Sequence, residues 1–369
     1  MQQQIENNQT GNNIYEKRLI GLRAKLREIN ADAALIAKRE NYIYLSGFTG
    51  TFANLIITQD SAFLITDFRY VEQAAEQARL FEIIRYGGKL EDTLNELLIR
   101  KNVNILGFEE THLSFAEYSK YKEKLSVKEL VPLGGAVEDL RMVKDETEIE
   151  IIRRAVQIAD NAFTHILGCI KPGLAEVEIA AEIEYSMKKQ GAEGASFETI
   201  VASGLRSSMP HGVASEKKVE LGDVITMDFG AVYKGYCSDI TRTVFLGRPR
   251  KELEHIYNIV LEAQLKSLEG AHKGLKGRDI DHIARKIITD AGFGEEFGHS
   301  LGHGVGLEIH EEPRFSPGSK QVMENGMAVT VEPGIYIKGV GGVRIEDLIV
   351  INDQNPIVLT KSPKELIVL

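Results

Sequence analysis

The sequence predicts a two-domain protein of the mixed α/β (α+β) class, and three observations support this prediction. Its 369 residues exceed the usual size of a single hydrophobic core. From about residue 15 to residue 131, helix-like and strand-like segments alternate. The rest of the chain repeats part of itself at an offset of 101 residues. We therefore expect a smaller α/β domain followed by a larger domain made of two related halves.

The first domain is expected to span residues 14–141. A charged helix (EKRLIGLRAKLREI) precedes four short apolar runs that predict strands: AALIA, NLIITQD, SAFLITD and NILGFE. Residues 1–13 have neither the basic start nor the apolar middle of a secretory signal, and we expect a disordered or appended tail there.

The second domain is expected to span residues 142–369. It opens with a helix for which Asp145 or Thr147 can serve as the N-cap. Segments 170–192 and 271–293 then align with each other, matching Gly173 with Gly274, Leu174 with Leu275, Ile179 with Ile280 and Gly191 with Gly292. Two unrelated helices that begin with Gly-Leu would give the same matches. A duplication would imply a pseudo-two-fold axis, with an active site between the halves.

Composition excludes several classes of partner. The net charge is −10 and no long Lys/Arg run occurs, which argues against nucleic-acid binding. No apolar run reaches the roughly 18 residues that a membrane helix needs. Cys169 and Cys237 are too few for a disulfide framework and wrongly spaced for a Cys-based zinc site, so a reduced, cytoplasmic setting is expected.

Two predicted hairpins bring carboxylates together. In residues 224–245, a turn centred between Tyr233 and Lys234 would place Asp228 opposite Asp239. Such a pair repels by several tenths of a kcal/mol or more, unless a cation lies between the two acids.

The second hairpin joins residues 327–337 to 342–351. Its register would place Glu332 opposite Glu346, with Arg344 on the same face two residues away. Each acid could instead be a solvated strand residue. Two mirrored pairs within apolar strands favour a shared metal centre.

Four carboxylates and a histidine can hold two divalent ions. The mainly oxygen ligands suit manganese best, and cobalt or zinc would also fit. Two-metal centres produce hydroxide from water near neutral pH and polarise carbonyl groups, which is the chemistry of hydrolysis. The histidine would come from HGVGLEIHEEP, residues 303 to 313, where His303 and His310 are both candidates.

Over nearly its whole length the sequence resembles the pita-bread metallopeptidases of family M24, which include aminopeptidase P, prolidase and methionine aminopeptidase. The resemblance rests on MPHGVAS, MDFG, CSDITRT, GHSLGHGVGLEIHE, VEPGIY and VRIEDLIVI, which occur in this order. It implies a creatinase-type (RNase H-like) N-terminal domain followed by a pita-bread catalytic domain with an internal pseudo-two-fold repeat.

The resemblance also implies roles for individual residues. His211 would contact the substrate carbonyl, His310 would face the substrate and His299 is a possible substrate-binding residue. Glu332 would relay a proton while remaining a ligand, and Arg344 would orient Glu346 or a neighbouring acid. Asp239 and Glu346 would bridge the two ions. The full set of implied metal ligands is Asp228, Asp239, His303, Glu332 and Glu346.

Methionine aminopeptidases normally lack the N-terminal domain, so the resemblance favours an Xaa-Pro peptidase. We lean towards aminopeptidase P, which acts on peptides with proline at the second position. Prolidase, an Xaa-Pro dipeptidase, is the alternative, and the motifs do not separate the two. A non-catalytic peptide-binding protein is disfavoured because the ligand set is complete. Family members are usually oligomers, and a homodimer is expected.

Overall fold

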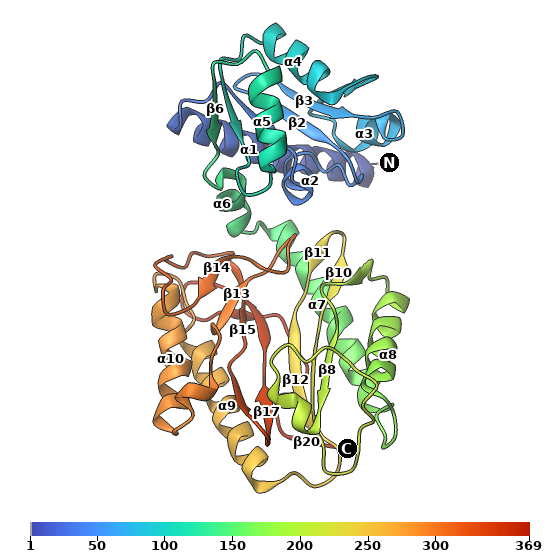
Figure 1. Cartoon of the computed structure of the whole chain (residues 1–369), viewed down its shortest axis with the longest axis vertical. Helices are drawn as coiled ribbons and strands as arrows, with labels where there is room; N and C mark the ends of the chain where they lie inside the picture. Colours follow the sequence, from blue (N-terminus) through green and yellow to red (C-terminus); the bar gives the residue numbers. More distant parts are fainter. Residues whose placement is uncertain (1) are drawn as a thin grey trace. The chain divides into compact units, whose positions relative to one another are not determined.

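The computed structural model describes the chain from Gln2 to Leu369, with side chains from Ile14 onward. It forms two compact units, Met1–Arg141 and Met142–Leu369 (Figure 1). Among the helices described, none combines the length and the apolar character that a bilayer span needs.

The first unit is a six-stranded sheet with helices around it. The sheet order is β4-β3-β2-β1-β5-β6, and pairing is antiparallel from β1 to β3 and parallel elsewhere. Its strands are β1 (Ala33–Ile36), β2 (Asn54–Thr58), β3 (Ala62–Thr66), β4 (Glu82–Arg85), β5 (Ile105–Phe108) and β6 (Glu129–Pro132). Its helices are α1 (Gln2–Glu28), α2 (Arg39–Ser46), α3 (Val71–Gln77), α4 (Leu90–Arg100), α5 (Phe115–Lys124) and α6 (Ala136–Met142).

The four apolar runs of the first domain are confirmed as strands. They form β1, β2, β3 and β5, and β1 to β3 are buried along their whole length. Such continuous apolar runs suit strands that are covered on both faces. The predicted tail, residues 1–13, lies outside the residues whose side chains are described, so it stays a prediction.

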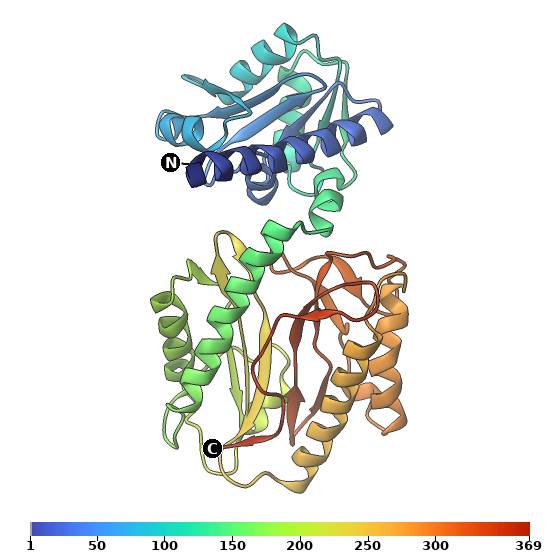
Figure 2. The ribbon, with the colours of Figure 1, turned by 180° about the vertical axis from the view of Figure 1, so that it is seen from behind.

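The second unit consists of two halves with similar helices. The helices are α7 (Glu146–Leu167), α8 (Glu176–Lys189), α9 (Lys251–Gly270) and α10 (Gly277–Asp290), with short 3₁₀ turns η1 (Gly204–Ser208) and η2 (Gly294–Glu296). Seen from behind, α7 and α9 each lie across the strands of one half, and α8 and α10 lie at the outer sides (Figure 2). Asp145, and not Thr147, caps α7, in a capping box with Glu148.

The second unit has two main sheets, ordered β20-β12-β9-β8 and β14-β13-β15-β18-β19, and two small ones, ordered β11-β10-β7 and β16-β17. In chain order the strands are β7 (Gly194–Ala195), β8 (Ile200–Ser203), β9 (Val224–Phe229), β10 (Ala231–Tyr233), β11 (Tyr236–Cys237), β12 (Ile240–Phe245), β13 (Gly302–Gly304), β14 (Glu311–Phe315), β15 (Ala328–Val331), β16 (Gly334–Ile337), β17 (Gly341–Arg344), β18 (Asp347–Val350), β19 (Ile357–Val358) and β20 (Ile367–Val368).

The internal repeat is confirmed. Both ends of α10 lie 101 residues after the corresponding ends of α8. The matched glycines also share a backbone conformation: φ is 93° at Gly173 and 90° at Gly274, and 98° at Gly191 and 90° at Gly292. These left-handed values favour glycine, which explains why it recurs at these positions. Each half has its own buried core.

The first hairpin has a different register from the predicted one. Asp228 pairs with Thr241, and Tyr233 pairs with Tyr236, so the turn is centred between Lys234 and Gly235. Both turn residues have positive φ, 49° and 79°, as the tight hairpin turn that fits twisted strands requires. The shift of two residues keeps Asp239 on the predicted face because side chains alternate with a period of two.

The second hairpin has the predicted register. Gly334 pairs with Arg344 in β16 and β17, and Val331 pairs with Asp347 in β15 and β18. Glu332 and Glu346 lie between these two ladders, on opposite strands. The prediction that they face each other across the hairpin is therefore consistent with the pairing on either side.

Candidate metal centre

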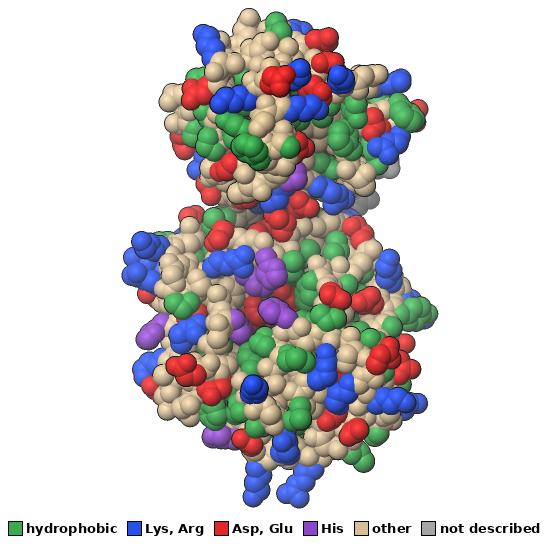
Figure 3. Space-filling view, in the orientation of Figure 1, with side chains coloured by type: hydrophobic (Ala, Val, Ile, Leu, Met, Phe, Trp, Pro, Cys, Tyr) green, Lys and Arg blue, Asp and Glu red, His purple; other side chains and the backbone are tan. Residues whose placement is uncertain are grey.

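All nine residues singled out from the sequence line one cavity of about 460 Å³ in the second unit. Figure 3 shows histidine and acidic side chains gathered at a recess in the surface. The residues come from strands, turns and loops in both halves of the unit; they are His211, Asp228, Asp239, His299, His303, His310, Glu332, Arg344 and Glu346.

His303 lies among the acids. Its Nε2 is 3.6 Å from Asp239 Oδ2 and 3.3 Å from Glu332 Oε1. Ligand atoms of Asp239, His303 and Glu346 all lie within 4.8 Å of one another. Nδ1 of His303 lies 3.1 Å from the backbone oxygen of Gly304. That oxygen can only accept, so Nδ1 carries a proton, and Nε2 is oriented towards the acids as a metal ligand requires.

Burial and crowding perturb the pKa values of the four carboxylates. Burial, reinforced by the neighbouring acids, raises the pKa values of Asp239 and Glu346 well above the ordinary range. Burial also raises the pKa of Asp228. Burial also tends to raise the pKa of Glu332. A hydrogen bond from His303 and the charge of His303 outweigh this effect and lower the pKa to about 2.

Three carboxylate oxygens are buried without a hydrogen-bond partner among the described residues. They are Asp228 Oδ1, Asp239 Oδ1 and Glu346 Oε1. A buried carboxylate without a partner is strongly unfavourable, so native proteins pair such groups or use them to coordinate metals. Divalent cations among these oxygens would satisfy them and remove the repulsion between the acids. The residues present therefore fit a metal centre.

Arg344 holds two of the four acids from one side. It donates to Asp228 Oδ2 at 2.5 Å and to Thr241 Oγ1 at 3.0 Å, and Thr241 Oγ1 donates to Glu346 Oε2 at 2.7 Å. We expected Arg344 to orient Glu346 or a neighbouring acid. It contacts Asp228 directly and reaches Glu346 through Thr241, which sequence reasoning missed although it lies only two residues after Asp239.

His211 and His310 are exposed and line the cavity. The ring centroids of His310 and His303 are 4.3 Å apart. Burial, and then the charge of His303, lower the pKa of His310, so its neutral form is favoured near neutral pH. His310 can therefore contact a bound molecule without being a nearest neighbour of the acids.

His299 is held by the protein itself. Its Nδ1 lies 2.8 Å from the backbone oxygen of Ser300, to which it donates, so Nε2 accepts from the Tyr336 hydroxyl at 3.0 Å. Arg344 donates to the same hydroxyl at 2.8 Å. Tyr336 is a second residue that sequence reasoning missed, although it lies within the VEPGIY segment.

The glycines of HGVGLEIHEEP serve the loop itself. A Cβ on Gly304 would lie 2.3 Å from the backbone oxygen of Glu312, and one on Gly306 would lie 2.3 Å from the Glu311 carboxylate. Glu311 in turn forms a buried ion pair of 2.6 Å with Lys144. Other parts of the same loop are thus the nearest neighbours at both positions, and glycine allows the loop to fold tightly on itself.

Comparison with known families gives two matches that together span most of the chain. The model of the Creatinase/Prolidase N-terminal domain matches residues 18–143. The model of metallopeptidase family M24 matches residues 150–353, more than half of the chain.

Comparison with individual proteins agrees. The chain is 51% identical to the solved Xaa-Pro dipeptidase from Bacillus anthracis, with a TM-score of 0.95 over 96% of this chain and 100% of that one. It is 44% identical to an Xaa-Pro dipeptidase of Pyrococcus furiosus over 95% of this chain and 100% of that protein. The solved X-Pro aminopeptidase from Thermotoga maritima is 42% identical, with a TM-score of 0.88 over 94% of this chain and 100% of that one.

Proposed function

The chain belongs to metallopeptidase family M24, and from that premise we propose that it is an Xaa-Pro dipeptidase. The two similar dipeptidases described above are 51% and 44% identical to it, and the aminopeptidase is 42% identical. The sequence alone led us to lean towards aminopeptidase P. The comparisons favour the alternative, the dipeptidase, and membership of a metallopeptidase family disfavours a protein that only binds peptides.

We assign five residues to the metal centre, and the three unpartnered carboxylate oxygens carry the assignment. Two divalent ions would balance the four acids, and the oxygen-rich set suits manganese best, with cobalt or zinc also possible. Bound there, the ions would act as Lewis acids and lower the pKa of water, which is the chemistry that amide hydrolysis needs. The proposed ligands are Asp228, Asp239, His303, Glu332 and Glu346.

Other side chains would bind the substrate and transfer protons. His211 and His310 are placed to donate hydrogen bonds to the oxygen of the scissile carbonyl, where negative charge develops. Glu332 would accept a proton from the attacking water at a carboxylate oxygen and pass it to the leaving proline nitrogen.

The cavity lining is suited to an apolar residue as well. Five of its members are apolar and could pack against a pyrrolidine ring: Phe197, Ile200, Pro210, Val213 and Ile309. An Xaa-Pro bond has no N–H to donate, so recognition must come from the ring and the carbonyl.

Arg314 supports the choice of a dipeptide. Arg314 lines the cavity, and its ion pair with Glu312 is long, at 3.9 Å. The other arginine of the cavity, Arg344, forms a close ion pair with Asp228 at 2.5 Å. The free carboxylate on the proline distinguishes a dipeptide from a longer peptide, and Arg314 is a cation available to bind it. Sequence reasoning missed this residue, although it lies only four positions after His310.

A comparison of Ala-Pro, Ala-Pro-Ala and Ala-Ala in the presence of manganese tests the proposal. We expect Ala-Pro to be hydrolysed fastest and Ala-Ala scarcely at all. Arg314→Gln should raise KM for Ala-Pro. Arg278→Gln, which changes an exposed arginine that does not line the cavity, should not. Faster cleavage of Ala-Pro-Ala would identify an aminopeptidase instead. The expected homodimer and cytoplasmic setting stay predictions.

A further inference from the structure

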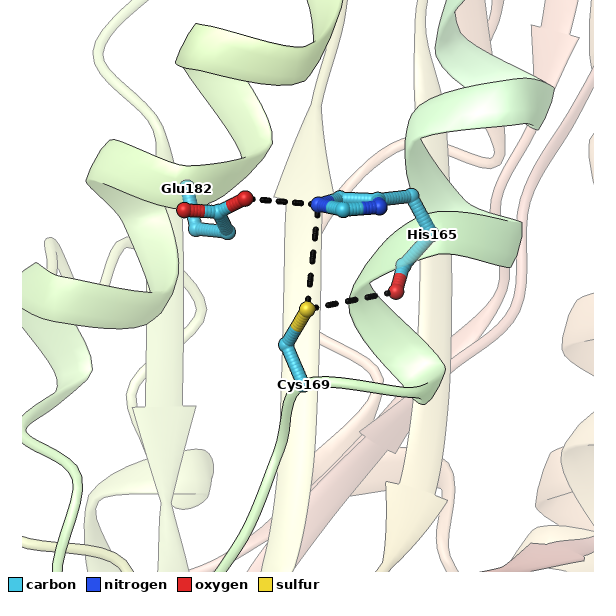
Figure 4. A group of neighbouring side chains, drawn as sticks. All are labelled: His165, Cys169 and Glu182. Carbon is cyan, nitrogen blue, oxygen red and sulfur yellow. Dashed lines mark hydrogen bonds and ion pairs between the residues drawn. The ribbon is translucent and has the colours of Figure 1, made fainter.

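A second group of potential metal ligands lies on the helices of the first half of the catalytic unit. His165 is in the last turn of α7, Cys169 follows the end of that helix, and Glu182 is on α8 (Figure 4). None of the three lines the cavity described above. His165 and Glu182 are 45% and 40% exposed, so an ion from solution can reach them.

The three side chains converge on one point. Nε2 of His165 is 2.6 Å from Glu182 Oε1 and 3.7 Å from Cys169 Sγ. A single ring nitrogen therefore faces both the carboxylate and the thiol, and it can form a good hydrogen bond with only one of them. In a nucleophilic triad the base uses opposite ring nitrogens for the nucleophile and the orienting acid. The geometry thus differs from that of a Cys-His-Glu triad, whereas a cation would bind all three donors at once.

The distances suit a tetrahedral transition-metal ion. Zinc–sulfur bonds of about 2.3 Å and zinc–nitrogen bonds of about 2.0–2.1 Å place the two donor atoms roughly 3.6 Å apart in a tetrahedron. Sγ and Nε2 are already 3.7 Å apart. The Glu182 oxygen would have to move outward by somewhat less than about 1 Å to complete the site. Its half-exposed, flexible side chain allows this movement.

The backbone that carries the ligands is firmly held. The inner faces of α7 and α8 pack together in a buried core that includes Phe163, Ile166, Ile183 and Met187. Cys169 lies in the turn directly after α7, where its Sγ donates to the backbone oxygen of His165 at 3.5 Å. Two of the three donors are therefore positioned before any ion binds.

The second half of the unit has no corresponding group. At the offset of 101 residues, His165, Cys169 and Glu182 correspond to Lys266, Gly270 and Ile283. There, a Cβ on Gly270 would lie only 2.3 Å from Ile283 Cδ1, so the two positions are in close apolar contact. The ligand triad is thus not a consequence of the repeat.

We propose that Cys169, His165 and Glu182 bind a borderline divalent ion such as Zn²⁺, with water as the fourth ligand, and that this ion fastens the end of α7 to α8. The sequence argued only against a Cys-based zinc site, because its two cysteines are far apart. A mixed sulfur, nitrogen and oxygen set needs only one of them. The site is independent of the dinuclear centre and of the proposed substrate.

Cobalt absorption tests the proposal without relying on activity. A thiolate bound to Co²⁺ gives a charge-transfer band in the near ultraviolet, which a site with only oxygen and nitrogen ligands does not give. We expect Co²⁺ to produce this band in the wild-type protein, and Zn²⁺ to abolish it by competition. The band should disappear in Cys169→Ser, and it should persist in Cys237→Ser, which alters the other cysteine, a buried residue.

Affinity provides the second measurement. Loss of a direct ligand should weaken Zn²⁺ binding at this site by at least about 100-fold, the upper end of the effect of outer hydrogen-bonding partners. We expect this result for Cys169→Ser and His165→Gln, but not for His272→Gln, which changes a partly buried histidine outside the cluster. Absence of the band at excess Co²⁺, or its survival in Cys169→Ser, would overturn the proposal.

Discussion

Glu346 and Asp347 are adjacent in the chain and equally buried, with 1% and 0% of their surface exposed, but they lie in opposite electrostatic surroundings. Asp347 accepts hydrogen bonds from Arg242 at 2.7 Å, from Gln264 at 2.9 Å and from Lys364 at 2.5 Å. Burial tends to raise its pKa, but the charges of Arg242 and Lys364 outweigh this effect and lower it.

The surroundings of Glu346 contain an excess of acids. Burial, Glu332 and Asp228 raise its pKa well above the usual range, and its Oε1 has no hydrogen-bond partner. Because adjacent strand residues point to opposite faces, one face meets cations supplied by the protein while the other meets mainly acids. Burial alone therefore does not mark a metal site. A metal site is indicated instead by a buried carboxylate that no cationic side chain of the protein neutralises.

The largest effect on activity is expected from His303→Ala, on the face that carries Glu346 and the other acids. This change removes the nitrogen ligand, so one ion should bind weakly. The value of kcat should fall by at least about 1,000-fold, since a catalytic metal contributes several kcal/mol to transition-state stabilisation. Metal analysis and steady-state kinetics on the same preparation measure both effects. If the variant kept its metal and its activity, the centre would lie elsewhere.

Changes on the opposite face, which carries Asp347, should alter the free energy of unfolding. Asp347→Ala leaves the buried Arg242 without its main partner and should lower the free energy of unfolding by about 3–5 kcal/mol. Glu346→Gln in metal-free protein removes an acid whose charged form is disfavoured by burial and by Glu332 and Asp228, so it should be neutral or stabilising. Urea unfolding of both variants in chelator checks this contrast. Equal destabilisation by the two changes would remove the distinction between the faces.

His310→Ala separates substrate contact from metal binding. It leaves every proposed ligand in place, so metal content should be unchanged. We expect kcat to fall on the order of 100-fold, as for loss of a positioned hydrogen-bonding or proton-transfer group. Loss of metal from His310→Ala together with its retention in His303→Ala would reverse the two assignments.

The last effect is a change in the pH dependence of stability. In metal-free protein, Asp239 and Glu346 have raised pKa values, so the folded state binds more protons than the unfolded state. The free energy of unfolding should then fall as pH rises above the ordinary carboxyl pKa, by up to about 1.4 kcal/mol per pH unit for each group.

Asp347, whose pKa is lowered, contributes in the opposite sense: its stabilisation is lost as pH falls through its folded-state pKa. Urea unfolding between about pH 5 and pH 8 in chelator should show the fall, and Glu346→Gln should reduce it. A stability that rose with pH in both proteins would contradict the raised pKa values.

Much of this candidate site could be predicted from the sequence because its four acids lie in or beside the strands of two recognisable hairpins. The register of the second hairpin followed from its turn, Lys338 to Gly341, and proved correct. The first was displaced by two residues because Lys234 also adopts a positive φ, which its residue type does not reveal. A register error of two residues leaves each side chain on the same face of the hairpin, so Asp228 and Asp239 still line one cavity.

What the sequence did not reveal depends on contacts between distant segments. Arg344 contacts Asp228, 116 positions away, and no local pattern indicates which acid it would choose. The meeting of His165 with Glu182 depends on how α7 packs against α8. Side chains that belong to one strand or turn were predictable, whereas partners brought together by packing were not.

The number of manganese ions bound per chain tests the central claim most directly. Measured on Cys169→Ser protein, so that the helix site does not contribute, it should be about two, and it should fall in Glu346→Gln but not in a conservative change on the opposite face, Asp347→Asn. A value well below one in fully active protein, or equal loss of metal from both variants, would contradict a dinuclear centre built on the unneutralised acids.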